Sequence, residues 1–203
     1  MSDDAQAAVS KAFLAEVIPR MEGWLSADRA KEMYDLVRSV RPDSLVEIGV
    51  FGGRSLLAQA AALKDNGKGR IIGIDPWKRE AALEQLDDGQ SPWWMSIDLH
   101  AVHSDCMETI WNFDLDPFVT IIRSTSQDCA HMIPPIDILY IDGNHTEVAS
   151  CRDVNLYLPK VKQNGYIWFD DCQWTSTQKA LAMVQEACVL VKDCGDYRLY
   201  CKK

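Results

Sequence analysis

Residues 44–63 read SLVEIGVFGGRSLLAQAAAL, and their pattern indicates the class of fold. Its first part, residues 44–50, is a short apolar run that ends at glycines, which predicts a buried β-strand. Its last part, residues 55–63, is rich in alanine and leucine and predicts an α-helix. Alternation of strands and helices is typical of βαβ units, so we expect a parallel sheet with helices on both faces.

The rest of the chain repeats this alternation. Further strands are predicted at RIIGID (70–75), FVTIIR (118–123), IDILYID (136–142) and GYIWFDD (165–171). Helices are expected within the first forty residues, where Ser26 can cap residues 27–40, and at 146–160 and 175–188. Residues 189–201 hold two short β-rich runs about Gly195, which predict a closing hairpin. The expected fold is a three-layer α/β Rossmann-like sandwich, with a mostly parallel seven-stranded sheet and a C-terminal antiparallel hairpin.

The composition limits the classes of protein that the chain can represent. It has 203 residues and a formal net charge of −9 at pH 7. An acidic chain lacks the basic face that neutralises phosphates, and no run approaches the roughly 20 apolar residues of a membrane span. We therefore expect neither a nucleic-acid nor a membrane partner, and the sequence leaves the oligomeric state open.

One domain spanning residues 1–203 is expected, because the sequence holds no repeats, low-complexity tracts or Ser/Gly linkers. Within it, residues 1–41 are predicted to form N-terminal helices, and residues 76–117 a polar insert. The seven cysteines are odd in number and scattered, without a CxxC pair, and the acidic N-terminus is unlike a secretory signal. These features predict free thiols and a cytoplasmic location.

The polar residues after each strand are candidates for the functional site, because such sheets bind ligands outside the carboxyl ends of their strands. The loop EIGVFGGRS, residues 47–55, follows the first strand, and its glycines allow the backbone to approach a ligand closely. It lacks the G-K-[ST] ending of a phosphate loop, and Arg54 stands where the dinucleotide fingerprint has its last glycine. Tight turns also need glycine, so the loop alone is a weak signal.

Asp75, at the end of the second strand, strengthens the signal. A carboxylate at this position can accept hydrogen bonds from both hydroxyls of a ribose. An aspartate before a proline more often forms a turn, and that alternative stays open for Asp75 taken alone. Combined with the glycine loop on the neighbouring strand, Asp75 predicts a nucleoside-like ligand.

Three more acids, Asp142, Asp170 and Asp171, end the fourth and fifth strands. If these strands are neighbours about 4.8 Å apart, the carboxylates repel one another and need protons or a cation. Oxygen ligands suit Mg²⁺, Ca²⁺ or Mn²⁺. Successive strand residues point to opposite faces, so Asp170 and Asp171 can share an ion only if the chain turns there. The alternative is that these acids cap helices or turns.

His145 lies in the loop just past Asp142, where an imidazole can take part in proton transfer. A surface or structural role is the alternative. The insert at residues 76–117 is placed to act as a lid over an acceptor pocket, and ordinary core packing of extra helices explains its aromatic residues equally well. Those residues are Trp77, Trp93, Trp94 and Trp111. His100 and His103 have helical spacing, but a metal site there would lack a third ligand.

Two motifs carry a family resemblance. The loop at residues 47–55 and GID at residues 73–75 resemble the first motif and the ribose-binding acid of class I S-adenosylmethionine-dependent methyltransferases, and the likeness extends over about residues 45–201. Residues 136–171 are similar to a smaller family with IDG-x-H and FDD elements, which contains macrolide and aminocoumarin sugar O-methyltransferases and cephalosporin-hydroxylase-like proteins. The resemblance implies S-adenosylmethionine as cofactor, with a divalent metal, usually magnesium, beside it.

The resemblance also implies roles for individual residues. The cofactor-binding residues would be Glu47, Gly49, Phe51, Gly53, Ser55, Asp75, Ser126 and Asp142. The metal ligands would be Asp142, Asp170 and Asp171. The catalytic groups that take the proton would be His145 and Asp142.

The sequence therefore predicts an S-adenosylmethionine-dependent O-methyltransferase, assisted by a divalent metal, that acts on a small-molecule hydroxyl. An alcohol that keeps its hydroxyl proton is a poor nucleophile, so a metal that lowers the pKa of the hydroxyl and a base that removes the proton would both favour methyl transfer. One alternative is a nucleotide-utilising oxidoreductase, whose fingerprint the glycine loop fits less well. Another is a member of the same fold that does not methylate, such as a hydroxylase-like or binding protein. No motif indicates which hydroxyl compound is the acceptor.

Overall fold

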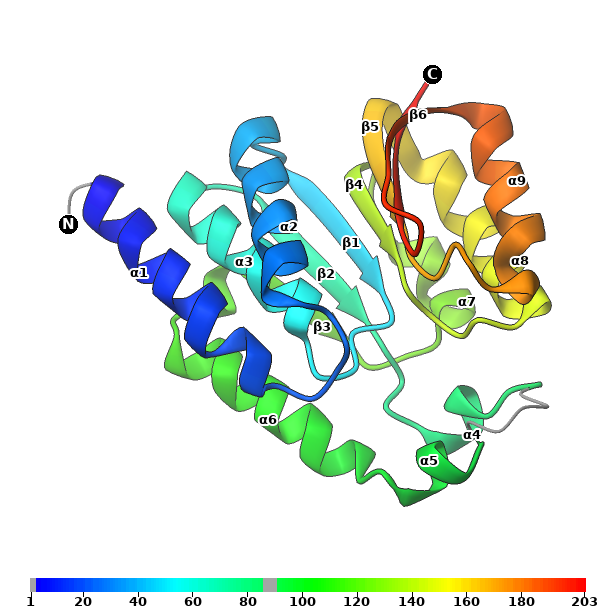
Figure 1. Cartoon of the computed structure of the whole chain (residues 1–203), viewed down its shortest axis with the longest axis horizontal. Helices are drawn as coiled ribbons and strands as arrows, with labels where there is room; N and C mark the ends of the chain where they lie inside the picture. Colours follow the sequence, from blue (N-terminus) through cyan, green and yellow to red (C-terminus); the bar gives the residue numbers. More distant parts are fainter. Residues whose placement is uncertain (1–2, 86–90) are drawn as a thin grey trace.

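The computed structural model describes residues 3–85 and 91–203 and contains one seven-stranded sheet (Figure 1). The strands are β1 Ser44–Ile48, β2 Arg70–Ile74, β3 Val119–Ile122, β4 Ile136–Ile141, β5 Val161–Phe169, β6 Cys188–Asp193 and β7 Arg198–Lys202. Their order is β3-β2-β1-β4-β5-β7-β6, with β1 to β5 parallel and β7 antiparallel to both β5 and β6. The predicted fold, with its closing antiparallel hairpin, is confirmed.

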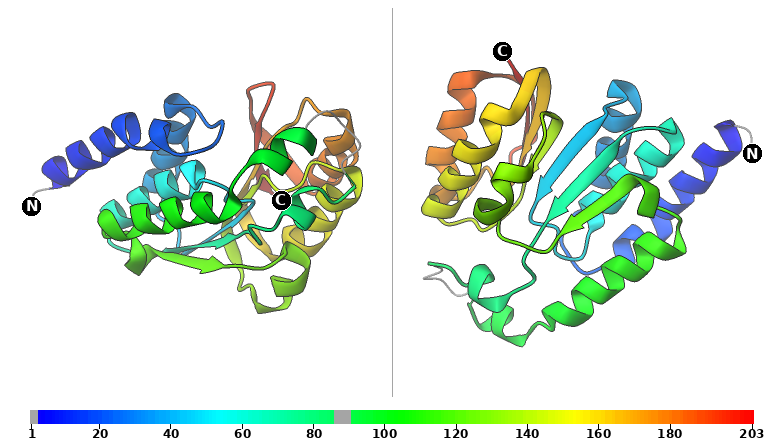
Figure 2. Two further views of the ribbon diagram at one scale, coloured as in Figure 1. Left: turned by 90° about the horizontal axis from the view of Figure 1, so that it is seen from below. Right: turned by 180° about the vertical axis from the view of Figure 1, so that it is seen from behind.

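Helices cover both faces of the sheet and make the three layers (Figure 2). The α-helices are α1 Asp3–Glu16, α2 Ala27–Val40, α3 Arg54–Asn66, α4 Arg79–Ala82, α5 Ser91–Ser96, α6 Leu99–Asn112, α7 Ser126–Cys129, α8 Glu147–Tyr157 and α9 Gln178–Ala187. Short 3₁₀ helices lie at Ile18–Arg20, Asp116–Phe118, Ala130–Met132, Leu158–Lys160 and Thr175–Thr177. Across the described ranges, no helix combines the length and the apolar composition needed to span a bilayer.

Local sequence explains where α2 begins and ends. The hydroxyl of Ser26 accepts a hydrogen bond from the backbone N–H of Arg29 at 3.2 Å, so Ser26 is the predicted N-cap. The helix ends at Arg41, which adopts a left-handed conformation with φ +52°. Pro42 follows directly, and a proline disfavours helix at the residue before it.

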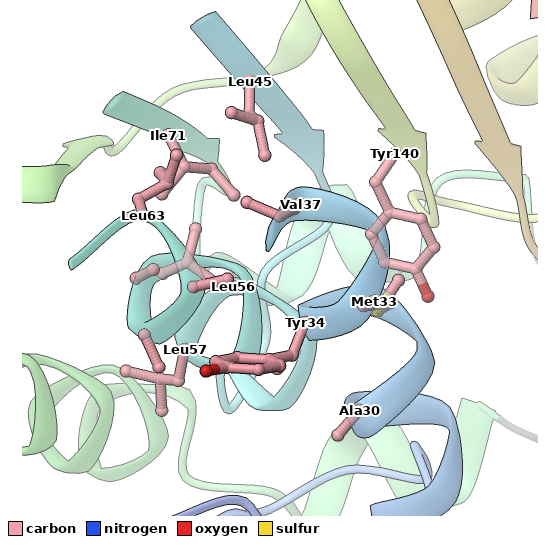
Figure 3. Close-up of a cluster of buried hydrophobic side chains, with 14 of the residues drawn as sticks. Ala30, Met33, Tyr34, Val37, Leu45, Leu56, Leu57, Leu63, Ile71 and Tyr140 are labelled. Atoms are coloured by element: carbon pink, nitrogen blue, oxygen red, sulfur yellow. The ribbon is translucent and has the colours of Figure 1, made fainter. Parts of the chain in front are cut away.

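The core consists of two clusters, one on each face of the sheet. Helices α1, α2, α3 and α6 pack on one face, and α7, α8 and α9 on the other. In the first cluster, Val37 of α2 and Leu56 of α3 lie beneath Leu45 of β1, and Met33 of α2 lies beside Tyr140 of β4 (Figure 3). The next residue of β1, Val46, belongs to the second cluster, as the alternation of side chains along a strand requires.

The carboxyl ends of the strands form one continuous edge. The backbone ladder continues one residue past the strands, because the N–H groups of Gly49, Asp142 and Asp170 still donate to carbonyls of neighbouring strands over 2.9–3.0 Å. Asp75 does the same at 3.3 Å. Four of the predicted site residues are thereby aligned along this edge.

The predicted insert, residues 76–117, divides into two parts. Helices α4 and α5 lie beyond the carboxyl ends of the strands (Figure 1). Helix α6 packs on the sheet, with Val102, Cys106 and Ile110 buried. Residues 86–90 of the insert lie outside the described residues, as do residues 1–2 of the predicted N-terminal helices.

Candidate active site

A cavity of about 640 Å³ lies along the carboxyl edge, within the size range of small-molecule sites. The glycine loop after β1 and the ends of β2, β4 and β5 form its floor. Residues 22–25 and the first part of the insert, up to Glu84, contribute to its walls. The cavity therefore lies at the edge of the sheet where the sequence predicts ligand binding.

The glycine loop approaches the neighbouring strand too closely for any side chain at its first position. Gly49 has φ +86°, and a Cβ atom there would lie 1.9 Å from the carbonyl oxygen of Asp142. Asp75 holds the loop in place, since Oδ2 accepts hydrogen bonds from the N–H groups of Val50 and Phe51 at 3.0 Å. Its Oδ1 accepts from the N–H of Trp77 at 2.7 Å. Burial raises the pKa of Asp75, and these three donors oppose that rise.

The predicted cofactor residues are not all in the cavity. Those that line it are Gly49, Phe51, Gly53, Ser55, Asp75, Ser126 and Asp142. Glu47 lies behind the loop and is fully buried, where it accepts hydrogen bonds from Ser55 Oγ at 2.7 Å and Gln59 Nε2 at 2.8 Å. Burial raises the pKa of Glu47 well above its ordinary range. Glu47 thus anchors the first turns of α3 to β1, and its predicted contact with the cofactor stays a prediction.

Ser126 has a partner that the sequence did not indicate. Its hydroxyl donates to Oδ1 of Asp153 on α8, and both residues line the cavity. The Asp153 side chain is 3% exposed, and burial raises its pKa to about 6. No sequence pattern relates the two residues, because they come from separate helices that meet only in the folded chain.

Asp142, His145 and Asp171 form a compact cluster. Nε2 of His145 lies 2.9 Å from Oδ2 of Asp171 and 3.5 Å from Oδ1 of Asp142. One potential ligand atom from each residue lies within 4.8 Å of the other two. Nε2 is buried and donates a well-directed hydrogen bond to neither carboxylate. Two carboxylate oxygens beside an unsatisfied ring nitrogen are a donor set that fits a divalent cation.

The same arrangement changes the acid–base properties of the cluster. Burial disfavours a charge on His145, but Asp142 and Asp171 outweigh it and raise the pKa of the imidazole to about 10. Burial by itself would raise the pKa of the Asp171 carboxyl. The contact with His145 outweighs burial and lowers this pKa below its ordinary value. Without a bound cation, His145 and Asp171 therefore form an ion pair at neutral pH.

Asp170 faces a different group. Asp171 has φ +51°, so the chain turns after β5, and the turn directs the two consecutive acids to different partners. Asp170 is 8% exposed and lies 2.6 Å from Nη2 of Arg29, which reaches it from α2. The hydroxyl of Tyr140 lies 2.6 Å from Asp170 and 2.9 Å from Asp142. Burial and the charge of Asp142 raise the pKa of Asp170 to about 7, against the effect of Arg29.

Sequence reasoning missed both Arg29 and Tyr140. Tyr140 precedes Asp142 by two residues on β4, so strand periodicity places the two on one face and could have indicated it. Arg29 has no such signal, because it reaches the site from α2 across the fold.

The N-terminal segment covers the glycine loop. The guanidinium of Arg54 donates to the backbone carbonyls of Met21 at 2.6–2.8 Å and of Leu25 at 2.9 Å. This clamp brings residues 22–25 into the cavity wall. The cavity is therefore completed by chain that precedes the first strand.

Polar contacts hold the first part of the insert against the site. Glu84 makes a two-point ion pair with Arg152 of α8, at 2.9 and 3.1 Å. The side-chain amide of Asn144 donates to the carbonyls of Ala81 and Glu84 at 3.2 and 3.1 Å. The indole N–H of Trp77 donates to the carbonyl of Phe51 at 2.9 Å. These contacts place α4 beside the loop that follows β4.

An aromatic wall closes one end of the cavity. It consists of Trp24, Phe51, Trp93 and Trp94, whose neighbouring ring centroids lie 4.9–5.9 Å apart. Trp24 is 71% exposed, which is unusual for so large an apolar side chain. The wall combines three segments that are separate in the sequence, and it presents flat apolar surfaces to a ligand.

Comparison with known proteins agrees with this geometry. Residues 46–172 match the family described as "Methyltransferase domain". An uncharacterized protein of Acanthamoeba polyphaga mimivirus is 32% identical over 143 residues, which are 68% of this chain and 57% of that protein. A caffeoyl-CoA O-methyltransferase of Stellaria longipes is 25% identical over 142 residues, which are 70% of this chain and 51% of that protein. The chain thus spans a little over half the length of these relatives.

Solved structures share the fold at low sequence identity. The O-methyltransferase NovP superposes with a TM-score of 0.74 and 15% identity, and each chain is covered in full. The O-methyltransferase TomG from Streptomyces achromogenes, in complex with S-adenosylmethionine, superposes with a TM-score of 0.62 and 15% identity, covering 100% of this chain and 91% of that one. The family match extends from β1 to the end of β5 and includes the glycine loop and the acidic edge. The chain therefore belongs to the methyltransferase-domain family.

Proposed function

We propose that the protein transfers the methyl group of S-adenosylmethionine to the hydroxyl oxygen of a small molecule, with assistance from a divalent cation such as Mg²⁺. One observation carries the proposal: a single cavity joins the glycine loop and Asp75 to the cluster of Asp142, His145 and Asp171. The glycine loop and Asp75 are suited to binding a nucleoside, and the three-residue cluster is suited to activating a hydroxyl. Reactants held in one cavity gain the advantage of proximity.

The family match and the bound ligand of TomG support the choice of cofactor. Residues 49–53 present backbone to the cavity, and Asp75 retains acceptor capacity beyond its three backbone donors, since a carboxylate has about four acceptor positions. The aromatic wall supports a cyclic acceptor, because flat rings pack well against tryptophan.

The chain's own groups supply the acid–base chemistry of the proposed reaction. The predicted cation ligands are Asp142, Asp170 and Asp171, and a cation bound by them would lower the pKa of the acceptor hydroxyl. His145 or Asp142 takes the proton from the hydroxyl oxygen as the methyl group arrives. Helices α4 and α5 of the insert serve as a lid that excludes water from the reacting atoms.

The family match favours methyl transfer over a nucleotide-utilising oxidoreductase. Methyl transfer measured with S-adenosylmethionine distinguishes an active enzyme from a non-methylating relative. The proposal also includes a cytoplasmic location, which the seven free cysteines support. Its partner is a small molecule, and neither a nucleic acid nor a membrane is proposed.

Calorimetric titration with S-adenosylmethionine tests the cofactor. Asp75→Ala should weaken binding at least about tenfold, since two charge-assisted hydrogen bonds are lost. Circular dichroism checks that the variant folds, and Asp116→Ala, at an exposed position, is the control. Unchanged affinity in a folded Asp75 variant would remove Asp75 from the cofactor site.

Methyl transfer to a panel of hydroxyl compounds, with and without EDTA, tests the role of the cation. EDTA should abolish turnover and leave S-adenosylmethionine binding largely intact, because the glycine loop and Asp75 lie at the ends of β1 and β2, and the cofactor shares only Asp142 with the predicted cation ligands. Full turnover in EDTA would contradict metal assistance and leave methyl transfer itself in place. Absence of S-adenosylmethionine binding would contradict the proposed function as a whole.

A further inference from the structure

We infer that the divalent cation binds to Asp142, His145 and Asp171, and that Asp170 stays outside its coordination shell because Arg29 holds it. The inference rests on the proposed function, in which a cation assists the reaction. It departs from the three-aspartate set predicted from the sequence by exchanging one carboxylate for an imidazole.

Asp170 already pairs with a positive charge. Oδ2 lies 2.6 Å from both the guanidinium of Arg29 and the hydroxyl of Tyr140, and Oδ1 accepts from the N–H of Asp171 at 2.8 Å. A cation at Asp170 would have to approach a permanently charged guanidinium or displace it. The positive charge that Asp170 needs is therefore supplied by the chain itself.

Arg29 is held firmly in this position. Its guanidinium lies 4.1 Å from the centroid of the Tyr197 ring, close enough for a cation–π contact. The hydroxyl of Tyr197 in turn donates to Glu32 at 2.7 Å, one turn further along α2. The loop before β7 thus holds the arginine on α2, and Asp170 cannot turn toward the cluster without breaking its own contacts with Arg29 and Tyr140.

The remaining three residues have the geometry of a cation site. Oxygens of Asp142 and Asp171 converge on Nε2 of His145, and this buried nitrogen has no hydrogen-bond partner. Without a cation, Nε2 carries the proton of the ion pair with Asp171, and a cation bound at Nε2 would displace that proton and take over the interaction with both carboxylates. The side chains of all three are 24–29% exposed, so solvent or an acceptor hydroxyl can complete the shell.

The donor set has two chemical consequences. An imidazole ligand favours Mn²⁺ and later transition metals over Mg²⁺, which strongly prefers oxygen. A nitrogen bound to the cation has no lone pair for a proton, so Asp142 remains as the group that takes the proton from the acceptor.

Electron paramagnetic resonance of bound Mn²⁺ tests the inference on the full chain. Pulsed spectra should show modulation from a directly bound ¹⁴N nucleus, and His145→Gln should remove it. His131→Gln, at an exposed position, is the matched control and should keep it. Bound Mn²⁺ without the nitrogen signal in the unaltered protein, or no bound Mn²⁺, would overturn the inference without any variant having to fold.

Affinities measured on the same samples test the role of Asp170. His145→Gln and Asp171→Asn should each weaken Mn²⁺ binding about tenfold or more, while folded Asp170→Asn should change it less than about threefold. Equal losses in the Asp170 and Asp171 variants, or equal affinities for Mg²⁺ and Mn²⁺, would overturn the inference. Calorimetry with S-adenosylmethionine on these samples keeps failure of the cation site distinct from failure of the proposed function.

Discussion

Asp153 is a buried acid whose protonation makes stability depend on pH. Its pKa in the folded protein is about 6, against about 3.8 in water. Between these values the folded state binds the proton more tightly than the unfolded state does. The free energy of unfolding therefore falls as the pH rises from about 4 to about 6, and the stabilisation lost is about 3 kcal/mol.

We predict that Asp153→Asn removes this dependence. The amide oxygen can still accept from Ser126, but the side chain no longer ionises. Urea unfolding should show the variant gaining about 2.4 kcal/mol relative to the unaltered protein between pH 4 and pH 7.5. Asp116→Asn, at an exposed position, should show no such gain. If the difference in free energy of unfolding between the variant and the unaltered protein did not change with pH, Asp153 would not be the group responsible for the pH dependence.

At the scale of elements, the junction of β1 with the glycine loop depends on the absence of a side chain. Gly49 and Gly67 both have positive φ, +86° and +65°, but a Cβ at Gly67 meets no atom within 4 Å. Gly67→Ala should therefore cost only backbone strain, about 1 kcal/mol. Gly49→Ala adds a collision with the backbone of Asp142 and should cost about 3 kcal/mol or more. Equal losses in urea unfolding would show that β1 and β4 separate easily.

The attachment of the insert can be weakened without unfolding the protein. Glu84→Gln breaks the two-point pair with Arg152, and the free energy of unfolding should change by less than about 1 kcal/mol because the pair is partly exposed. Limited proteolysis should nevertheless cut within residues 76–117 faster, since the segment just after α4 loses its ion pair with α8. Glu147→Gln breaks an exposed pair with Lys179 elsewhere and is the control. An unchanged rate of cleavage would show that the hydrogen bonds of Asn144 alone hold the first part of the insert in place.

At the scale of the whole molecule, the N-terminal helices share a core with the sheet. Phe13 of α1 and Met33 of α2 belong to the same buried cluster as Trp168 of β5 and Leu199 of β7. We therefore expect calorimetry to show one cooperative unfolding transition, with a heat-capacity change of roughly 2.5–3 kcal/mol/K for 203 residues. Two resolved transitions would contradict the prediction of one domain over residues 1–203.

The acidic edge shows how far prediction from sequence reached. The apolar runs before Asp142 and Asp170 predicted two strands but left open whether they are neighbours, and the pairing of Ile141 with Phe169 shows that they are. Which way each acid points was beyond the pattern. It depends on the left-handed turn at Asp171 and on the position of Arg29, which no local spacing encodes.

The succession of strands and helices along the chain, the closing hairpin and the glycines after β1 could be predicted from the amino-acid sequence. These follow from short-range causes: side-chain alternation, helix propensity, and backbone conformations open to glycine. The folded structure was needed to show that Glu47 lies behind the loop, that Asp153 meets Ser126 and that Arg29 holds Asp170. Each of these contacts joins groups from separate elements, so its geometry exists only once the layers have packed, and burial then changes the charge that each acid carries.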